Sequence, residues 1–314
     1  MTKEAPADAI DAVVTWVDGA DPAHAARRAQ YRDPAAHADA AGPVRFTSSG
    51  EIRYALASLL RFCPFLRHIH VLTDRQRPAA LDALSDPSGK VRVVDHADAF
   101  GAHADLLPVF SSRSIETMMH RIPGLAERFI YLNDDIFVGR EMEPEDYFNG
   151  PIPVLQGVMK PLPAPALQWL KETFGGRRPG YGAAQRSAAR RVGRRKTYLL
   201  VEHQPHPMRR STLAAFYDGN AEALRAQAGH RFRMPEQVSP IGLTHHLELE
   251  LGARVIPPRD VGYVSPGRPT GRALAATLAA LESGAFASFC VQSLEKMPPE
   301  DQTAVRDALD RYYG

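Results

Sequence analysis

The sequence predicts an α/β fold with a mostly parallel central sheet flanked by helices. Short apolar runs rich in β-branched and aromatic residues recur along the first half of the 314-residue chain, as expected of buried strands. Segments with helical spacing separate these runs, which is the pattern of βαβ units. Each run ends on an acidic or amide residue, and ligands bind at the carboxyl ends of strands in such sheets. We therefore expect an acidic functional site at the edge formed by the carboxyl ends of the strands.

The predicted elements of the first half follow from these apolar runs and from the residues that begin and end each helix. Strands are predicted at 10–17, 69–73, 91–94 and 129–132, and helices at 24–31, 50–61, 78–84 and 114–122. Either Ser48 or Ser49 can cap the helix at 50–61, because a serine oxygen accepts from the free amides of a first turn. Pro123 and Gly124 end the helix that precedes the fourth strand.

The second half is predicted to contain fewer regular elements. Strands are predicted at 198–202 and 254–256, and helices at 209–228, 239–251 and 299–312. Residues 151–200 are first proline-rich and then strongly basic. The basic residues are Arg177, Arg178, Arg186, Arg190, Arg191, Arg194, Arg195 and Lys196. They indicate a solvated helix face or mobile loop, or else a basic lid over an anionic substrate or a contact with a polyanion.

Composition argues against several functional classes. With 44% hydrophobic residues the chain can bury a sizeable core, and a net charge of +2 gives no electrostatic case for nucleic acid. Cys63 and Cys290 match no metal spacing and favour a reducing compartment, with one disulfide as the alternative. No apolar leader and no run of about 18 apolar residues occurs. We expect a cytoplasmic protein without a transmembrane segment that reaches a membrane only through partners. Its oligomeric state stays open.

One stretch, FIYLNDDIFVGR at 129–140, organises the predicted functional site. Asp134 and Asp135 follow a buried strand, and two adjacent carboxylates are costly to bury unpaired. Such a pair suits a hard divalent cation, which takes oxygen ligands and shares them with substrate phosphates. The alternative is a tight turn, since Asn133 and both aspartates also favour turns.

A second acidic turn follows the first predicted strand. Asp18 and Asp21 stand in the sequence DGADP directly after the apolar run at 10–17. A strand-end aspartate followed by glycine is common at nucleotide or metal sites of α/β enzymes, and it is also an ordinary turn. Both interpretations stay open on the local sequence.

Several motifs in order resemble the conserved regions of the Stealth family. IDAVVTWVDGADP, at 10–22, is similar to its first region, and FIYLNDDIFVG belongs to a stretch similar to its second. HQPHPMRRSTL, with a later FRM, resembles the third. The matching segments are 10–22, 45–78 with 107–139, 203–213 with 232–234, and 286–293 in the place of the fourth region. The family includes bacterial capsular polysaccharide phosphotransferases and the catalytic subunit of lysosomal-enzyme N-acetylglucosamine-1-phosphotransferase.

The resemblance implies a sugar-1-phosphate transferase on a nucleotide-diphospho-sugar-transferase-like (GT-A-like) α/β core with a helical, basic insertion. Such an enzyme moves a hexose-1-phosphate from a UDP-sugar donor to a sugar hydroxyl of a saccharide or glycopolymer acceptor, with Mg²⁺ or Mn²⁺ as cofactor. The products are a phosphodiester and UMP, in capsular polysaccharide, exopolysaccharide or cell-wall glycopolymer synthesis.

We expect a single catalytic domain over residues 1–314. The nucleotide-sugar- and metal-binding α/β half is assigned to 9–150, the basic insertion or lid to 151–200, and the second catalytic half to 201–314.

Two other functions stay open. A metal-dependent glycosyltransferase would use the same acid pair but would release UDP. A sugar-nucleotide-binding protein that has lost catalysis is indicated by Gln292 and Ser293, which stand where family members usually carry Asn-Asp.

The resemblance also implies roles for single residues. Asp134 and Asp135 are the predicted metal ligands, with Asp135 also assigned to catalysis. His203 is the predicted general base or phosphate ligand, with a structural histidine as the alternative. Arg233 is predicted to contact phosphate, because a guanidinium suits two phosphate oxygens. Glu116 is predicted to bind a sugar hydroxyl or to orient His203.

The remaining predicted site residues bind substrate. Helix capping could also explain Ser112, and an ion pair could explain Glu51 and Arg53. The predicted substrate-binding residues are Asp18, Asp21, Arg45, Glu51, Arg53, Ser112, Asn133 and His206.

Overall fold

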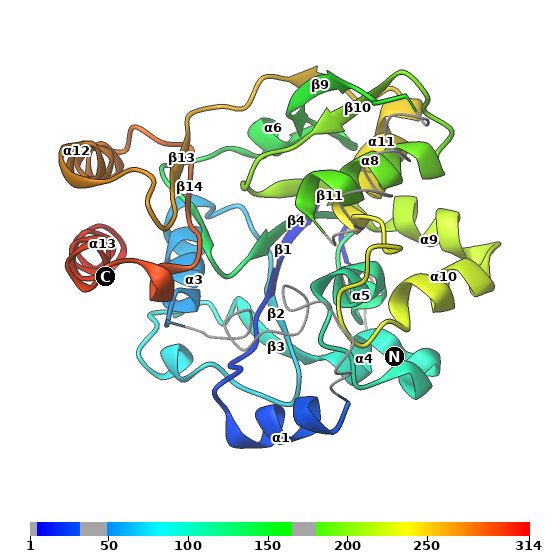
Figure 1. The fold of residues 1–314 in the computed structure, drawn as a ribbon, viewed down its shortest axis with the longest axis horizontal. Coiled ribbons are helices and arrows are strands. Elements are labelled where there is room, and N and C mark those ends of the chain that lie inside the picture. The colour runs from blue at the N-terminus through cyan, green and yellow to red at the C-terminus, as the bar shows by residue number, and fades with distance from the viewer. Residues whose placement is uncertain (1–4, 32–48, 165–179) are drawn as a thin grey trace.

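A computed structural model describes residues 5–31, 49–164 and 180–314 of the chain. Its centre is a five-stranded sheet with the strand order β11-β4-β1-β2-β3. Four of the strands are parallel, and β11 runs antiparallel to β4 at one edge (Figure 1). The strands are β1 (Ile10–Thr15), β2 (Ile69–Thr73), β3 (Val91–Asp95), β4 (Arg128–Asn133) and β11 (His206–Arg209). The predicted α/β class with a mostly parallel sheet is confirmed.

Both faces of the central strands are buried, which explains their continuous apolar sequences. In β1, Ile10, Ala12 and Val14 belong to the core that contains α3 residues, whereas Val13 belongs to the core that contains α5 residues. The side chains alternate between the two cores because successive strand residues point to opposite faces.

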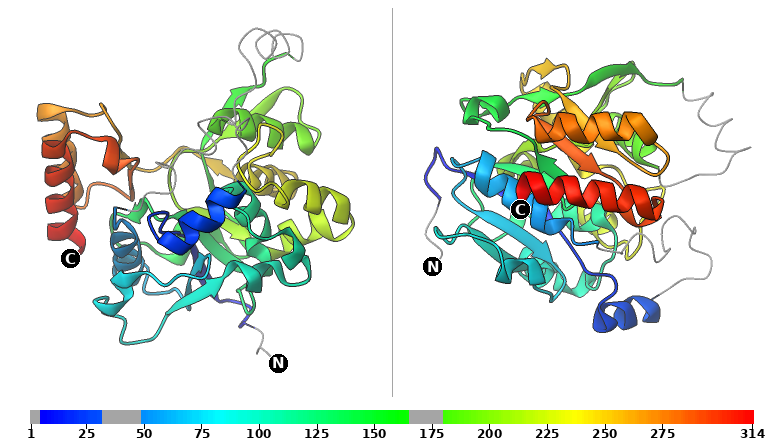
Figure 2. Two further views of the ribbon diagram at one scale, coloured as in Figure 1. Left: turned by 60° about the horizontal axis from the view of Figure 1, so that its bottom comes forward. Right: turned by 90° about the vertical axis from the view of Figure 1, so that its left-hand side faces the viewer.

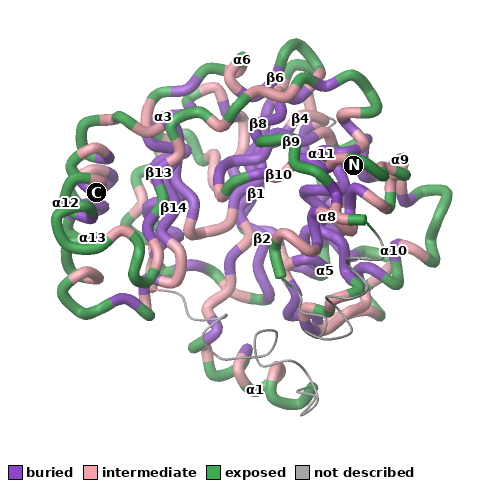
Figure 3. Tube along the Cα trace, turned by 45° about the horizontal axis from the view of Figure 1, so that its top comes forward, coloured by how far each residue is buried: buried purple, intermediate pink, exposed green. Residues whose placement is uncertain are grey.

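Helices cover the sheet on both sides (Figures 1 and 2). On one side α13 packs on α3 and α12 packs on α13. This group comprises α3 (Ile52–Phe62), α12 (Gly271–Glu282) and α13 (Pro299–Tyr313). The other group comprises α4 (His96–Phe100), α5 (Ser112–Met118), α9 (Arg210–Asp218) and α10 (Ala221–Ala228). A further helix, α1 (Pro22–Gln30), extends from the body with only His24 buried (Figure 3).

A smaller sheet places a strand from the last part of the chain beside the acidic turn. It contains β5 (Ile136–Val138), β13 (Val261–Val264) and β14 (Ser288–Val291). Strand β14 pairs antiparallel with β5 and parallel with β13. The amide of Val291 donates to the carbonyl oxygen of Asp135 at 3.0 Å. The fourth motif segment therefore lies directly beside the second.

The basic segment folds into a helix and a strand pair. Helix α8 (Tyr181–Arg191) packs on α11 (Pro240–Glu250), and β10 (Thr197–Leu200) pairs antiparallel with β9 (Val158–Pro161). Arg194 forms an ion pair with Glu250 at 2.8 Å. Short elements complete this region: α6 (Pro144–Tyr147), β6 (Phe148–Asn149), β7 (Ile152–Pro153), β8 (Leu155–Gln156) and β12 (Val255–Ile256). The predicted basic residues Arg177 and Arg178 lie outside the described residues.

Two expectations about local structure were wrong. The predicted helix at 209–228 is two helices, because Asn220 caps α10 by accepting from the amide of Ala223 at 3.0 Å. The predicted helix at 78–84 is one 3₁₀ turn. Of the two serines predicted to cap α3, Ser49 does not cap it, and its amide donates to Oε2 of Glu51 at 2.7 Å. Ser48 lies outside the described residues. The 3₁₀ turns are η2 (Ala79–Asp82), η3 (Gly101–Leu106), η4 (Met119–Arg121) and η5 (Leu294–Lys296).

Two further observations bear on the sequence predictions. Cys63 and Cys290 are both buried, free thiols. Among the described helices, none combines the length and the apolar character that crossing a bilayer requires.

Candidate functional site

The candidate site lies at the carboxyl end of β4, where the chain turns into β5. The hydroxyl of Tyr131 is 2.8 Å from Oδ1 of Asn133, 3.0 Å from Oγ1 of Thr15 and 3.3 Å from Oε1 of Glu116. Two neighbouring strands and α5 therefore share one buried polar network. This network fixes the side chain of Asn133 at the start of the acidic turn.

Asp134, Asp135 and Glu51 form a cluster of buried carboxyl groups. Burial, together with the charge of Glu51, raises the pKa of Asp135 to about 7. Burial and the charge of Asp135 raise the pKa of Asp134 well above its usual range. Burial also raises the pKa of Glu51. In the described part of the chain, no cationic side chain fully offsets the desolvation of these carboxyl groups.

The donor set at this turn fits a divalent cation in part. Oδ1 of Asp135 is buried, and among the described residues it has no hydrogen-bond partner. An unpaired carboxylate oxygen is a suitable ligand for Mg²⁺ or Mn²⁺. However, nowhere in residues 5–31, 49–164 and 180–314 do three or more His, Cys, Asp or Glu side chains form a complete metal site. The residues therefore suit a cation that takes its other ligands from substrate phosphates and water.

A second group faces the network from α5 and the loop after α10. Nη2 of Arg233 donates to Oγ of Ser112 at 2.7 Å. Burial raises the pKa of Glu116, whereas the positive charge of Arg233 lowers it. The ring of Phe232 stacks on Phe110 with centroids 5.4 Å apart, which fixes the backbone next to Arg233. Arg233, Ser112 and Glu116 thus lie together beside the Tyr131 network.

His203 lies between two tyrosine rings. Its ring centroid is 4.9 Å from that of Tyr181 and 5.7 Å from that of Tyr263. Burial lowers the pKa of His203, which favours the neutral imidazole. His206 is buried on β11, beside the ring of His245 at 5.3 Å, and burial keeps its pKa well below the usual value.

Tyr263 connects the imidazole to the acidic turn. It stacks on His203, and the nearby charge of Asp135 adds to burial in raising the pKa of the Tyr263 hydroxyl. That hydroxyl donates to Oε1 of Gln292. Tyr263 is thus in ring contact with His203 and within electrostatic reach of Asp135. Neither Tyr181 nor Tyr263 was identified from the sequence, since an isolated tyrosine carries no local signal.

One predicted site residue, Arg53, has other surroundings than the acidic turn. Arg53 forms an ion pair with Asp310 of α13 at 2.6 Å, with both side chains about half exposed. The alternative prediction of an ion pair between Glu51 and Arg53 is therefore wrong. The structural partner of Arg53 is Asp310. Arg45 lies outside the described residues.

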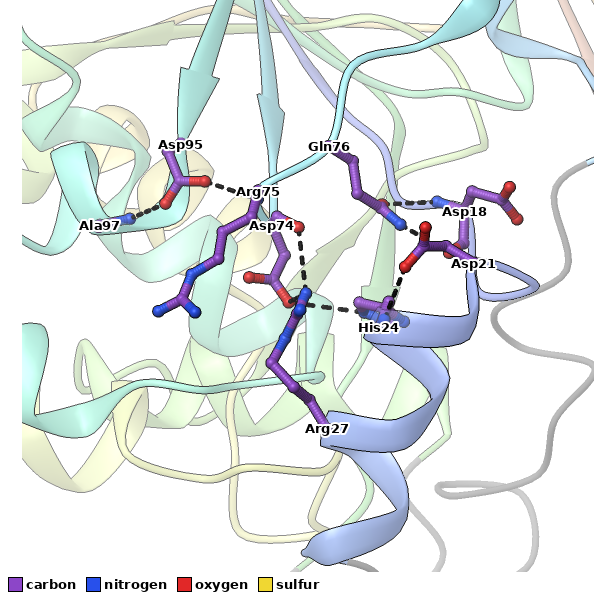
Figure 4. Close-up of polar contacts among 9 residues, drawn as sticks. All are labelled: Asp18, Asp21, His24, Arg27, Asp74, Arg75, Gln76, Asp95 and Ala97. Carbon is purple, nitrogen blue, oxygen red and sulfur yellow. Dashed lines mark hydrogen bonds and ion pairs between the residues drawn. The ribbon is translucent and has the colours of Figure 1, made fainter.

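Asp18 and Asp21 lie at the carboxyl end of β1 (Figure 4). Oδ1 of Asp21 accepts from the amide of His24 at 2.7 Å and caps α1. Oδ1 of Asp18 accepts from the amide of Ala20 at 2.8 Å, and Gln76 joins this turn to the end of β2. Both carboxylates thus have local structural roles. Their predicted role in binding a nucleotide stays a prediction.

Fold and site define an α/β protein with an acidic site at the carboxyl edge of a mostly parallel sheet, and its relatives are named as transferases. Residues 8–33 match the model of Stealth protein conserved region 1, and residues 45–152 match that of Stealth protein conserved region 2. The chain belongs to the Stealth family.

Curated relatives carry names that describe phosphotransfer. The chain is 37% identical, over 88% of its length, to exopolysaccharide phosphotransferase SCO6023 of Streptomyces coelicolor and covers 46% of that protein. It is 33% identical, over 97% of its length, to SCO2594 of the same organism and covers 50% of it. It is 40% identical, over 45% of its length, to capsular polysaccharide phosphotransferase cps1A of Actinobacillus pleuropneumoniae and covers 38% of it. The chain spans about half the length of the two Streptomyces proteins.

Solved structures with a similar chain course include glycosyltransferases. Galactosyltransferase LgtC matches over 96% of both chains with a TM-score of 0.41 and 11% identity. Mouse xyloside xylosyltransferase 1 matches 90% of this chain and 96% of its own, with a TM-score of 0.41 and 13% identity. At such TM-scores neither likeness supports a statement about chemistry.

Proposed function

We propose that this chain moves a hexose-1-phosphate from a UDP-sugar to a sugar hydroxyl in exopolysaccharide or capsular polysaccharide synthesis. The names of its Stealth relatives support phosphotransfer. The observation that carries the proposal is the buried Oδ1 of Asp135, which has no partner among the described residues and whose carboxyl group acts electrostatically on Tyr263, the stacking partner of His203. Phosphoryl transfer to a hydroxyl requires both charge neutralisation and a proton acceptor.

The proposed reaction exchanges one phosphorus–oxygen bond for another. The acceptor hydroxyl oxygen forms a bond to the β-phosphorus of the UDP-sugar. The bond from that phosphorus to the bridging oxygen breaks, and UMP leaves with the bridging oxygen. The hydroxyl proton passes to the imidazole of His203, which is held neutral by a lowered pKa.

Arg233 would bind the phosphate oxygens. One of its terminal nitrogens donates to Ser112, while its Nε is buried and has no partner among the described residues. An unpaired guanidinium N–H is available to a phosphate oxygen, and the guanidinium geometry suits two such oxygens. Glu116, whose charge lies near Arg233, would keep this cation oriented.

Asp134 and Asp135 would hold Mg²⁺ or Mn²⁺ together with phosphate oxygens of the donor. When bound, the cation would offset the negative charge of the diphosphate. The protein itself contributes the carboxylate oxygens and a negative surrounding, to which Glu51 and Glu295 add.

The test is a panel of UDP-sugars incubated with the protein, a saccharide acceptor and Mg²⁺ or Mn²⁺, with nucleotides separated by chromatography. We expect UMP as the product, and no UMP from Asp135→Asn or His203→Ala. Arg77→Ala is the control, because among the described residues the ion-pair partner of Arg77 is the exposed Asp82. Release of UDP instead would show glycosyl transfer. Tight binding of a UDP-sugar without turnover across acceptors would show a protein that has lost catalysis.

A further inference from the structure

Three aromatic rings from separate parts of the chain form one stack at the site. Tyr181 begins α8, His203 follows β10, and Tyr263 lies in β13. The planes of Tyr181 and His203 are inclined by 21°, and those of His203 and Tyr263 by 30°. Tyr181 and Tyr263 make no ring contact with each other, so they stack on opposite faces of the imidazole.

Tyr181 is held both at its hydroxyl group and at the backbone that precedes it. Its hydroxyl donates to the carbonyl oxygen of Val201 at 3.3 Å. The backbone just before it is held by Arg113 of α5, whose Nη2 donates to the carbonyl oxygen of Gly180 at 3.0 Å. The ring therefore has little freedom to leave the imidazole.

The Tyr263 side is fixed by the small sheet. Strand β13 pairs with β14 along its length, and the hydroxyl of Tyr263 donates to Gln292 just beyond β14. Tyr263 is 36% exposed and Tyr181 is 39% exposed. Both residues thus reach the surface, although their hydroxyls are anchored by hydrogen bonds.

No other interaction in the described part of the chain orients the imidazole. Among those residues, neither ring nitrogen of His203 has a hydrogen-bond partner. In many enzymes a carboxylate or carbonyl oxygen sets the orientation of a histidine base. In His203 the stacking contacts with the two tyrosine rings can set the orientation of the imidazole. Both ring nitrogens then stay available to substrate.

We infer that Tyr181 and Tyr263 are positioning residues that hold His203, by stacking on both faces, in the orientation that accepts the acceptor proton. This inference rests on the proposed function. Stacked rings restrict tilting of the imidazole but leave its edge open, and a proton acceptor must be aligned with the hydroxyl it serves. The tyrosine hydroxyls anchor the rings, and the rings act on the imidazole.

The first experiment tests the stacking of His203 by NMR and does not depend on enzymatic activity. Histidine side chains are labelled with ¹³C, and the His203 ring signal is assigned by its loss in His203→Gln. We expect an upfield ring-current shift in the wild type that is lost in Tyr181→Leu and Tyr263→Leu and kept in Tyr181→Phe and Tyr263→Phe. Tyr312→Leu is the matched control, because Tyr312 is a half-buried tyrosine that stacks on Phe62, outside this group.

The second experiment reads the consequence for transfer. In both leucine variants kcat for UMP release should fall on the order of 10- to 100-fold, because small misplacement of a reacting group is costly. The KM for the UDP-sugar should stay unchanged. The acidic limb of the kcat/KM profile should move to higher pH, since solvent reaching His203 returns its pKa toward the usual value. The phenylalanine variants should restore kcat.

The results separate the two ideas. Leucine variants that lose the ring-current shift but keep kcat and the pH profile would overturn the positioning role. An unshifted His203 signal in the wild type would overturn the stack itself. A wild-type protein that releases no UMP with any donor would overturn the proposed function, whereas the NMR comparison would still decide whether the tyrosines hold the imidazole.

Discussion

His96 should make the folded state sensitive to mild acid. It begins α4, is 2% exposed, and neither ring nitrogen has a hydrogen-bond partner among the described residues. Burial lowers its pKa from 6.5 to about 4, although Asp74 and Asp95 oppose this change. Below pH 6.5 the unfolded chain therefore binds a proton at this residue that the native state does not bind.

The size of the effect follows from the two pKa values. The shift from 6.5 to about 4 corresponds to roughly 3 kcal/mol of stability, at about 1.4 kcal/mol for each pKa unit. This stability is fully present above pH 6.5, is lost progressively as the pH falls toward 4, and changes no further below that value. His120 and His245, whose pKa values are lowered to about 4 and about 3, should add to the same trend.

The assay is urea unfolding at several pH values from 8 to 4.5, followed by circular dichroism. His96→Phe keeps a planar ring without the titration. We expect the difference in free energy of unfolding between variant and wild type to be constant above pH 6.5. At pH 4.5 the free energy of unfolding of the variant, relative to the wild type, should be higher than above pH 6.5 by roughly 2–3 kcal/mol. Parallel loss of stability in both proteins over this range would refute the reasoning.

Three further changes test the fold and the site. Glu248 is fully buried and accepts from Arg209 at 2.6 Å and from Thr212, so Glu248→Leu should lower the free energy of unfolding by about 3–5 kcal/mol. An unchanged urea midpoint would contradict this. A Cβ atom on Gly262 would lie 2.3 Å from Cδ2 of Phe289, so Gly262→Ala should cost about 1–3 kcal/mol by overpacking and lower the melting temperature. Asp135→Asn, measured at pH 8 with EDTA, should raise the melting temperature, because burial raises the pKa of this carboxyl to about 7 and makes its charged form unfavourable. A lower melting temperature would show that Asp135 is paired in the folded state.

The parallel strands could be predicted because they are buried on both faces. Strands β1, β2, β3 and β4 lie within two residues of the ranges expected from their apolar runs. The edge strand β11 was not predicted. It has four residues and contains Pro207, and proline normally argues against a strand. An edge position tolerates it, because only one side of the strand needs its full set of hydrogen bonds.

The acidic half of the site was visible in the sequence, whereas its aromatic half was not. Asp134 and Asp135 stand next to each other after a strand, so a local pattern indicates them. The stack of Tyr181, His203 and Tyr263 combines residues up to 82 positions apart, from a helix, a loop and a strand. Such a group exists only after β13 has paired with β14 and α8 has packed on α11.

The different surroundings of Glu51 and Arg53 follow from helix geometry. At about 3.6 residues per turn, residues two positions apart point in nearly opposite directions. Glu51, at the start of α3, is buried near Asp135, and each charge raises the energy of the other. Arg53 consequently faces α13, where it meets Asp310. The short spacing that grouped them in the sequence is the reason one helix cannot direct both side chains into a single pocket.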